Sequence, residues 1–301
     1  MTKIEKFISE RVELTNISCK TFLVTFFGDV ISMHGGWIWL GSLITTLSSL
    51  GYSERLVRTS VFRLVEDDWL QVNKIGRKSY YSLTQNAENH NKKAARRIYA
   101  PSNVSSSNEW LIVIPSFVAE DKLEPFKRQI RWLGFSTIAS SVYAHPSFDK
   151  NSLDELLKEM KLFEDVIIFS ANTADKQSSL ALRKLVFQKW NLKALQNKYD
   201  QLITDYQPIL NLISADQKMS FLHSFLLRLL VIHEYRRILL SDHELSKDML
   251  PNDWSGLKAN QLVKDLYVEL EKPSSIYISD RLESMEGFLP KCSNAFKNRF
   301  R

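Results

Sequence analysis

The sequence runs Leu40-Gly-Ser-Leu-Ile-Thr-Thr-Leu-Ser-Ser-Leu-Gly51 and continues Tyr52-Ser-Glu-Arg-Leu-Val-Arg-Thr-Ser-Val-Phe-Arg-Leu-Val65. The leucines and the isoleucine of the first stretch recur at helical spacing, which predicts a helix with one apolar face. Gly51 ends this helix, because glycine tolerates the positive φ angle of a helix terminus. Ser53 is a natural N-cap for a second helix. Two helices joined by so short a turn are typical of a helix-turn-helix.

The second helix divides into an apolar and a polar face. Val57, Val61 and Leu64 share one side at 100° per residue. Arginine can bind guanine edges in the major groove, while hydroxyl and aromatic groups can touch phosphates or thymine methyls. The alternative is an amphipathic surface helix whose charges are merely solvated. The DNA-binding candidates of the two helices are Ser42, Ser53, Arg55, Arg58, Thr59, Phe62 and Arg63.

A β-hairpin is expected directly after these helices. Residues 69–73 and 79–83 have strand composition, and Gly76 lies in the turn between them. A basic hairpin tip after a recognition helix suits a wing that contacts the phosphate backbone, although an ordinary solvated turn would have the same composition. The candidates at this tip are Lys74, Arg77, Lys78 and Ser79.

Composition bounds the remaining possibilities. The 301 residues carry a net charge of +6, which permits a polyanionic partner without demonstrating one. Cys19 and Cys292 lie in no CxxC spacing, so they predict neither a disulfide framework nor a thiolate metal site. The charged N-terminus does not resemble a signal peptide, and the most apolar run, residues 221–232, is too short to span a bilayer. We therefore expect a cytoplasmic protein without membrane contact.

The chain is expected to have an α+β fold of three domains. Residues 1–99 form the winged helix-turn-helix domain and end in a basic run, 92–97, that could reach DNA phosphates or be a solvated helix end. Residues 100–109 are polar and serine-rich, as linkers are. Residues 110–175 alternate as β-α-β-β-α-β, the ferredoxin-like order. Residues 176–301 are helical, with helices expected over 180–211 (broken near its end by Pro208), 216–240 and 253–270.

Eight segments along the chain together carry a family resemblance: Leu23–Asp29, Gly35–Ile44, Val57–Val65, Gly76–Thr84, Arg96–Tyr99, Arg131–Phe135, His233–Leu240 and Leu250–Trp254. In this order they resemble the PaaX family of bacterial transcriptional repressors. The resemblance implies a homodimeric repressor of phenylacetate catabolic genes, bound to a double-stranded DNA operator and released by phenylacetyl-CoA. It also implies a winged helix, a ferredoxin-like middle domain that joins subunits, and a helical C-terminal domain.

Given this resemblance, the polar cluster His233-Glu-Tyr-Arg-Arg237 is a candidate effector site. A zinc-protease reading fails, because position 237 is Arg where a second His is needed. The spacing of ten between His223, His233 and His243 likewise places them on different helical faces. Arginines could hold the coenzyme phosphates and an aromatic side chain could line the acyl pocket. A buried network between helices is the alternative. The effector candidates are Arg228, His233, Tyr235, Arg236 and Arg237.

Two further functions stay open. One is a regulator of the same family that senses another acyl-CoA or an aromatic acid. The other is a metal-dependent nuclease built on the ferredoxin-like domain, which would require an acidic residue at the end of its first strand. That strand ends Val113-Ile-Pro-Ser-Phe117 without one, and no nucleophile, phosphate-loop or dinucleotide motif appears. We therefore expect no enzyme activity, no cofactor and no metal.

Overall fold

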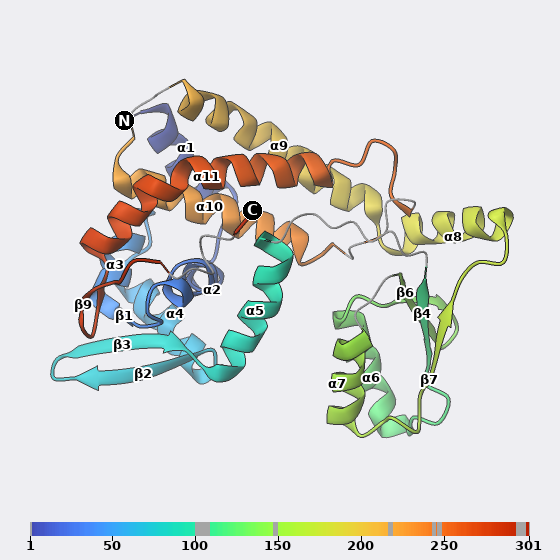
Figure 1. Ribbon diagram of the computed structural model, residues 1–301. Coiled ribbons are helices and arrows are strands. Elements are labelled where there is room, and N and C mark those ends of the chain that lie inside the picture. The colour runs from blue at the N-terminus through green and yellow to red at the C-terminus, as the bar shows by residue number, and fades with distance from the viewer. Residues whose placement is uncertain are drawn as a thin grey trace. The chain divides into compact units, whose positions relative to one another are not determined.

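The computed structural model describes residues 2–99, 109–146, 150–215, 219–242, 245, 249–292 and 299–300 (Figure 1). The expected linker lies outside this part of the chain except for Glu109, and so does His243. The chain forms two compact units. One comprises residues 1–102, 200–240 and 257–301, and the other comprises residues 103–199 and 241–256. The sequence predicts three consecutive domains, whereas the contacts define two units. Residues 200–240 and 257–301 of the expected C-terminal domain pack with the N-terminal residues.

The N-terminal part of the first unit holds the expected pair of helices and the hairpin. Strand β1 joins the hairpin in an antiparallel sheet of order β1-β3-β2. Strands β2 and β3 pair from Leu70↔Leu83 to Ile75↔Lys78, and Gly76 in the turn has a φ angle of 57°. The elements are α1 Lys3–Leu14, α2 Cys19–Asp29, η1 Ile31–Met33, β1 Ile38–Trp39, α3 Leu40–Ser48, α4 Glu54–Glu66, β2 Leu70–Ile75, β3 Lys78–Leu83 and α5 Gln85–Tyr99.

The C-terminal helices differ from expectation at their ends. The helix expected over 180–211 is two helices, because Asn191 adopts a left-handed φ of 46° between them. Pro208 does not break the second of these, which continues to Ser214. The third helix begins at Phe221, capped by Ser220, and the last runs well beyond residue 270. The elements are α8 Lys176–Lys189, α9 Leu192–Ser214, α10 Phe221–Leu239, α11 Gly256–Arg281, β8 Glu283–Ser284 and β9 Gly287–Phe288.

The second unit contains an antiparallel sheet of order β5-β6-β4-β7. This is the strand order of the β-α-β-β-α-β motif, so the expected ferredoxin-like topology is confirmed. One face of the sheet packs against α6 and α7 around Phe126 and Leu153, while α8 packs on the other face through Val186. The elements are β4 Trp110–Ile114, α6 Glu120–Trp132, β5 Ser136–Ala139, β6 Val142–Pro146, α7 Lys150–Met160 and β7 Ile167–Ala171.

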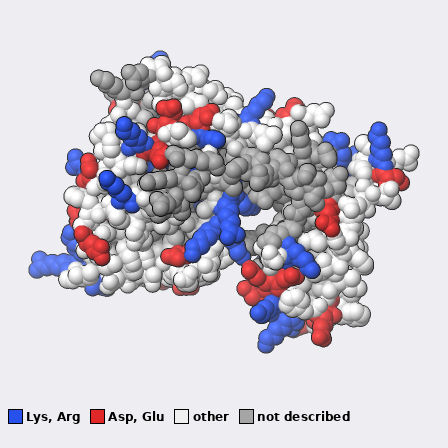
Figure 2. Space-filling view, viewed as in Figure 1, with Lys and Arg blue, Asp and Glu red and all other residues white. Residues whose placement is uncertain are grey.

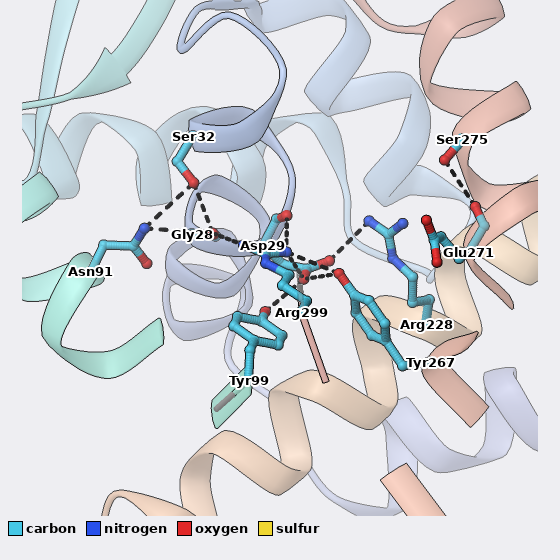
Figure 3. A network of polar contacts seen from close by, with 10 residues as sticks. All are labelled: Gly28, Asp29, Ser32, Asn91, Tyr99, Arg228, Tyr267, Glu271, Ser275 and Arg299. Carbon is cyan, nitrogen blue, oxygen red and sulfur yellow. Dashed lines mark hydrogen bonds and ion pairs between the residues drawn. The ribbon is translucent and has the colours of Figure 1, made fainter. Parts of the chain in front are cut away.

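A buried polar network ties the first unit together around Asp29, at the end of α2 (Figure 3). Its carboxylate pairs with Arg228 of α10 at 2.9 Å and with Arg299 at 2.8 Å. The hydroxyls of Tyr99 and Tyr267 donate to the same carboxylate at 2.6 and 3.1 Å. Burial acts to raise the pKa of Asp29, but the two guanidinium charges and the hydroxyls lower it, so the carboxylate stays ionised.

Candidate nucleic-acid interface

Helix α4 has an apolar face turned inward and a polar face turned outward. The Ser53 hydroxyl caps its N-terminus by accepting from the backbone N–H of Leu56 at 3.3 Å. The face turned inward buries Val57, Ser60, Val61 and Leu64. Phe62, an apolar side chain on the other side, is 62% exposed. The exposed face carries all five residues that the sequence places there: Arg55, Arg58, Thr59, Phe62 and Arg63.

The three arginines of this face differ in their partners. Arg58 forms an ion pair with Glu54 one turn earlier, at 2.7 Å between Nη2 and Oε1. The side chains of Arg55 and Arg63 make no hydrogen bond or ion pair with any residue that the structure describes. The hydroxyl of Thr59 donates to the Arg55 carbonyl within the helix at 2.8 Å. Arg55 and Arg63 are therefore available for a partner outside the chain, whereas the ion pair between Arg58 and Glu54 must break before Arg58 can bind one.

The β2–β3 hairpin exposes basic side chains at its tip. Lys74 and Arg77 are exposed and have no side-chain partner within the described residues. Figure 2 shows Lys and Arg side chains projecting at this end of the hairpin. Lys78 is also exposed, but its ammonium binds Glu283 at 2.9 Å and lies 4.2 Å from the centre of the Trp39 ring. Ser79 is half-buried, across the hairpin from Lys74.

Ser42 does not belong to the exposed surface, so its assignment to a DNA contact is wrong. Its side chain is 5% exposed, and its hydroxyl accepts the backbone N–H of Glu283 at 3.0 Å. Ser42 lies in the first turn of α3, and the sequence pattern could not show that a C-terminal strand covers this turn.

The short C-terminal hairpin β8–β9, which is not apparent from the sequence, lies beside the β2–β3 hairpin (Figure 1). Glu283 reaches Lys78, and the amide of Asn73 on β2 lies 3.3 Å from the sulfur of Met285. Two-residue strands give too short a pattern to detect. The one available signal is Gly287, whose φ angle of 111° marks a turn that favours glycine.

Three of the effector candidates on α10 are interior residues, so the structure contradicts their assignment to an effector site. Arg228 is fully buried and pairs with Asp29. His233 is also fully buried, and its Nδ1 lies 2.9 Å from the Thr25 hydroxyl. The Tyr235 hydroxyl accepts from the side-chain amide of Asn260 at 2.8 Å. For these residues the alternative of a buried polar network between helices is correct.

The buried histidine is neutral. Burial, together with the nearby charges of Arg236 and Arg237, lowers the pKa of His233 to about 3. A neutral imidazole hydrogen-bonded to a threonine hydroxyl inside the helical core stabilises packing and offers no charge to a ligand.

Arg236 and Arg237, in the last turn of α10, differ from the three buried candidates. Arg237 is exposed, and Arg236 is half-buried. The Arg236 guanidinium makes no hydrogen bond or ion pair with the part of the chain that the structure describes, and burial lowers its pKa. Nearby, Arg97 of α5 donates to the Leu239 carbonyl at 3.0 Å. The C-terminal ends of α5 and α10 thus bring arginines together.

Helix α5 contributes further positive charge. Lys92, Lys93 and Arg96 are exposed, and Figure 2 shows Lys and Arg gathered over this helix. Lys92 lies 3.8 Å from Glu88 one turn earlier, a weak solvent-exposed pair. The surface of α5 is suited to an anionic partner.

No carboxylate follows the first strand of the ferredoxin-like sheet, since β4 is succeeded by Pro115 and Ser116. Within the described residues, no three His, Cys, Asp or Glu side chains are grouped so that they could hold a metal ion. Among the same residues, none of the helices is both long and apolar enough to cross a membrane.

Comparisons with known proteins match nearly the whole chain. The family described as PaaX-like protein matches residues 18–87, the PaaX protein central Cas2-like domain matches residues 105–182, and the PaaX-like protein C-terminal domain matches residues 190–280. The chain is 33% identical over 301 residues to the transcriptional repressor PaaX of Escherichia coli (strain K12), covering 100% of this chain and 95% of the relative.

A solved structure, the uncharacterized protein Rv0674 from Mycobacterium tuberculosis, is 18% identical and has a TM-score of 0.49, with 83% of this chain and 94% of that chain covered. The family matches and the full-length identity to the E. coli protein decide the assignment. The chain belongs to the PaaX family.

Proposed function

We propose that this PaaX-family protein is a transcriptional repressor that binds double-stranded DNA through a winged helix-turn-helix. In this proposal α3 and α4 are the helix-turn-helix, α4 is the recognition helix, and β2–β3 is the wing. The observation that carries it is the exposed face of α4, where Arg55 and Arg63 lie free of partners among the described residues above a buried apolar face. The basic tip formed by Lys74 and Arg77 follows directly in the chain.

The division of labour follows from the chemistry of DNA. Side chains on α4 can reach base edges in the major groove, and only such contacts distinguish sequences. Lysine and arginine on the wing neutralise phosphates, which gives affinity without sequence preference and makes binding depend on salt. The similarity to a transcriptional repressor of E. coli supports this function.

The proposal is tested by selecting bound duplexes from a random library and measuring the affinity of the selected sequence and of a scrambled sequence. We expect the protein to prefer the selected duplex and Arg63→Ala to lose most of that preference. Lys258→Ala is the matched control, since Lys258 is exposed on α11 without a side-chain partner among the described residues. Equal binding to both duplexes by the unaltered protein would refute sequence-specific repression.

We also propose that the regulated genes serve phenylacetate catabolism and that phenylacetyl-CoA releases the protein from its operator. Support comes from the family, from Arg236, whose guanidinium makes no hydrogen bond or ion pair with the described residues, and from Arg237, which is exposed beside it in the last turn of α10. A panel of acyl-CoA thioesters and aromatic acids in the DNA-binding assay tests the choice of effector. Release by another member of the panel would favour a regulator with a different inducer.

The ferredoxin-like sheet of the second unit is proposed to join two subunits. Strand β7 is an edge of its sheet, and on it Ile167 and Phe169 are 41% and 50% exposed. An exposed apolar edge strand is a natural place for a second chain to pair. Light scattering should show a dimer that Phe169→Asp disrupts, while Leu14→Asp, at an exposed leucine of the first unit, leaves it intact. A monomeric unaltered protein would contradict this part.

The nuclease alternative receives no support from a specific observation. The end of β4 lacks the acidic residue that this hypothesis requires. Incubation with DNA or RNA and Mg²⁺ or Mn²⁺ should leave the substrate intact. Cleavage that stays with the protein through further purification would reopen that alternative.

A further inference from the structure

The C-terminal hairpin β8–β9 places a carboxylate on the wing. Glu283 binds the Lys78 ammonium at 2.9 Å, and the same ammonium lies 4.2 Å from the centre of the Trp39 ring. Lys78 therefore sits between a carboxylate and the face of an aromatic ring, both of which attract a cation. The hydrogen bond to Glu283 raises the pKa of Lys78, so the ammonium remains charged.

Hydrogen bonds within the hairpin and to N-terminal residues of the first unit hold the backbone of this hairpin in place. The N–H of Glu283 donates to the buried Ser42 hydroxyl at 3.0 Å, and the N–H of Leu289 donates to the Leu282 carbonyl at 2.8 Å. Beyond β9, Nδ1 of His34 lies 2.8 Å from the carbonyl oxygen of Pro290. Because the backbone is held at both ends of the hairpin, the Glu283 carboxylate has a defined position beside Lys78.

The hairpin is also directly connected to the long helix α11. Only Leu282, which is buried, separates the last residue of α11 from Glu283. Near its end α11 contacts α3, where the Tyr277 and Thr46 hydroxyls are 3.1 Å apart. The position of α11 on α3 therefore sets the position of Glu283 on the wing.

A wing lysine that is already paired contributes less to phosphate binding. Counterion release needs a cation that faces the phosphates, and Glu283 competes with them for Lys78. The hairpin carries a second carboxylate, Glu286, which is exposed and whose side chain has no partner among the described residues. The segment 283–288 thus adds two negative charges beside the basic tip of the wing.

We propose that the β8–β9 hairpin is an acidic clamp that restrains Lys78 and thereby lowers the DNA affinity of the wing. The clamp rests on the proposed DNA-binding function and regulates that same surface. Because Glu283 follows α11 so closely, a displacement of α11 that withdraws the carboxylate frees Lys78 for a phosphate. The clamp is a route by which the C-terminal helices act on the wing.

The decisive variant is Glu283→Gln, which removes the charge and keeps the shape of the side chain. We expect it to bind duplex DNA about three- to tenfold more tightly at low salt, with the slope of log K against log salt steeper by about 0.9, as for one added phosphate contact. Glu286→Gln is the matched control, since it makes the same charge change on the same hairpin. It should change affinity far less, because solvent screens an unpaired surface charge.

A second pair of measurements isolates Lys78. In a Lys78→Met background, Glu283→Gln should change DNA affinity no more than Glu286→Gln does, because the restrained cation is gone. Thermal unfolding verifies that each variant is folded. Glu283→Asp, which keeps the charge but shortens the side chain, provides a milder variant and should give a smaller gain in affinity.

The outcomes separate the clamp from the function on which it rests. If the unaltered protein binds no duplex at low salt, both proposals fail. If it binds and Glu283→Gln has the affinity and salt slope of the unaltered protein, the clamp alone is overturned. Weaker binding by folded Glu283→Gln also overturns it, because Glu283 would then orient Lys78 toward DNA.

Discussion

At the scale of single residues, the ion pair with Glu54 distinguishes Arg58 from Arg63, whose side chain has no partner among the described residues. We expect Arg63→Ala to cost about 1–3 kcal/mol of specific binding if Arg63 reads a base edge. Arg58→Ala should cost less, because Arg58 must give up its 2.7 Å ion pair with Glu54 before it can bind DNA. Titrations with the preferred duplex and with random DNA check both values.

The random duplex is the control for this pair of variants. A residue that reads bases loses affinity for the preferred duplex and little for random DNA. Equal losses on both duplexes for Arg63→Ala would mean that Arg63 touches phosphate only.

His233 makes stability depend on pH. Its pKa is about 3 in the folded protein against an ordinary 6.5, so the unfolded chain binds the proton more readily between these values. This contribution to stability is therefore complete above pH 6.5 and is lost as the pH falls toward 3, with a slope of up to about 1.4 kcal/mol per pH unit. Urea unfolding at pH 7 and pH 5 should show a smaller difference for His233→Gln than for the unaltered protein.

The control for this prediction is Gln85→Ala, because Gln85 is exposed on α5 and carries no titratable group. Its replacement should leave the pH dependence of unfolding nearly unchanged. A His233→Gln protein with the full pH dependence would show that other groups cause it.

At the scale of elements, the sequence predicted those features that depend on interactions between residues close together in the chain. The apolar spacing of α4, its Ser53 cap and the glycine turn of the hairpin are all contained within a few residues, so the sequence shows them directly. The ferredoxin-like strand order also follows from the succession of elements. The β8–β9 hairpin could not be predicted, because its short strands are held by contacts with residues more than 200 positions away, such as Ser42.

The same reason explains the misassigned side chains of α10. Arg228 looks like a ligand-binding arginine when only its helix is considered. Its carboxylate partner, Asp29, lies 199 positions earlier in the sequence. A sequence pattern cannot show a pairing over such a separation, so an exposed binding arginine and a buried structural one look alike.

The wing as an element should contribute charge and no sequence preference. Replacing Arg77 with Gln should weaken binding to all duplexes alike and make the salt slope shallower by about 0.9, since one phosphate contact is lost. Arg77 has no side-chain partner among the described residues, so nothing in that part of the chain offsets the loss. Affinity measured across a salt series for specific and random duplexes checks this, and an unchanged slope would remove the wing from the interface.

At the scale of the whole molecule, the first unit depends on Asp29, which lies at the meeting point of α2, α5, α10 and α11. Asp29→Asn should destabilise this unit by about 3–5 kcal/mol, because it leaves the charges of Arg228 and Arg299 buried without their carboxylate. Denaturant unfolding measures the loss. Glu88→Gln breaks only an exposed pair and should cost under about 0.5 kcal/mol. Equal stability of Asp29→Asn and the unaltered protein would contradict this role.

This network also explains why the sequence predicted three successive domains where the contacts define two units. Composition and periodicity marked the changes along the chain near residues 100 and 176. They could not show that α10 and α11 pack with the N-terminal helices, because that packing depends on Asp29 meeting Arg228, Tyr267 and Arg299. The effector candidates must be judged within the unit that the contacts define, which includes α3 and α4.

Within that unit, Arg236 and Arg237 are the arginines left to test for induction. A shift from 99% bound to 99% free requires the effector to prefer the DNA-free state by about 5.5 kcal/mol. Phenylacetate offers one ring and one carboxylate, whereas its CoA thioester adds a pyrophosphate and a 3′-phosphate that arginines can bind. Because a ligand shifts an equilibrium only by its differential affinity, the thioester has more contacts from which to build that preference.

We therefore expect phenylacetyl-CoA to release the operator at micromolar concentrations, while phenylacetate and CoA alone do not, as measured by fluorescence anisotropy of labelled DNA. Arg236→Ala should raise the concentration required for release without weakening DNA binding, since its guanidinium has no partner among the described residues to lose. Arg237→Ala should act in the same direction, and Lys258→Ala should respond as the unaltered protein does. Release by phenylacetate at the same concentration would exclude phosphate recognition as the source of the preference, and normal induction of both arginine variants would place the effector elsewhere.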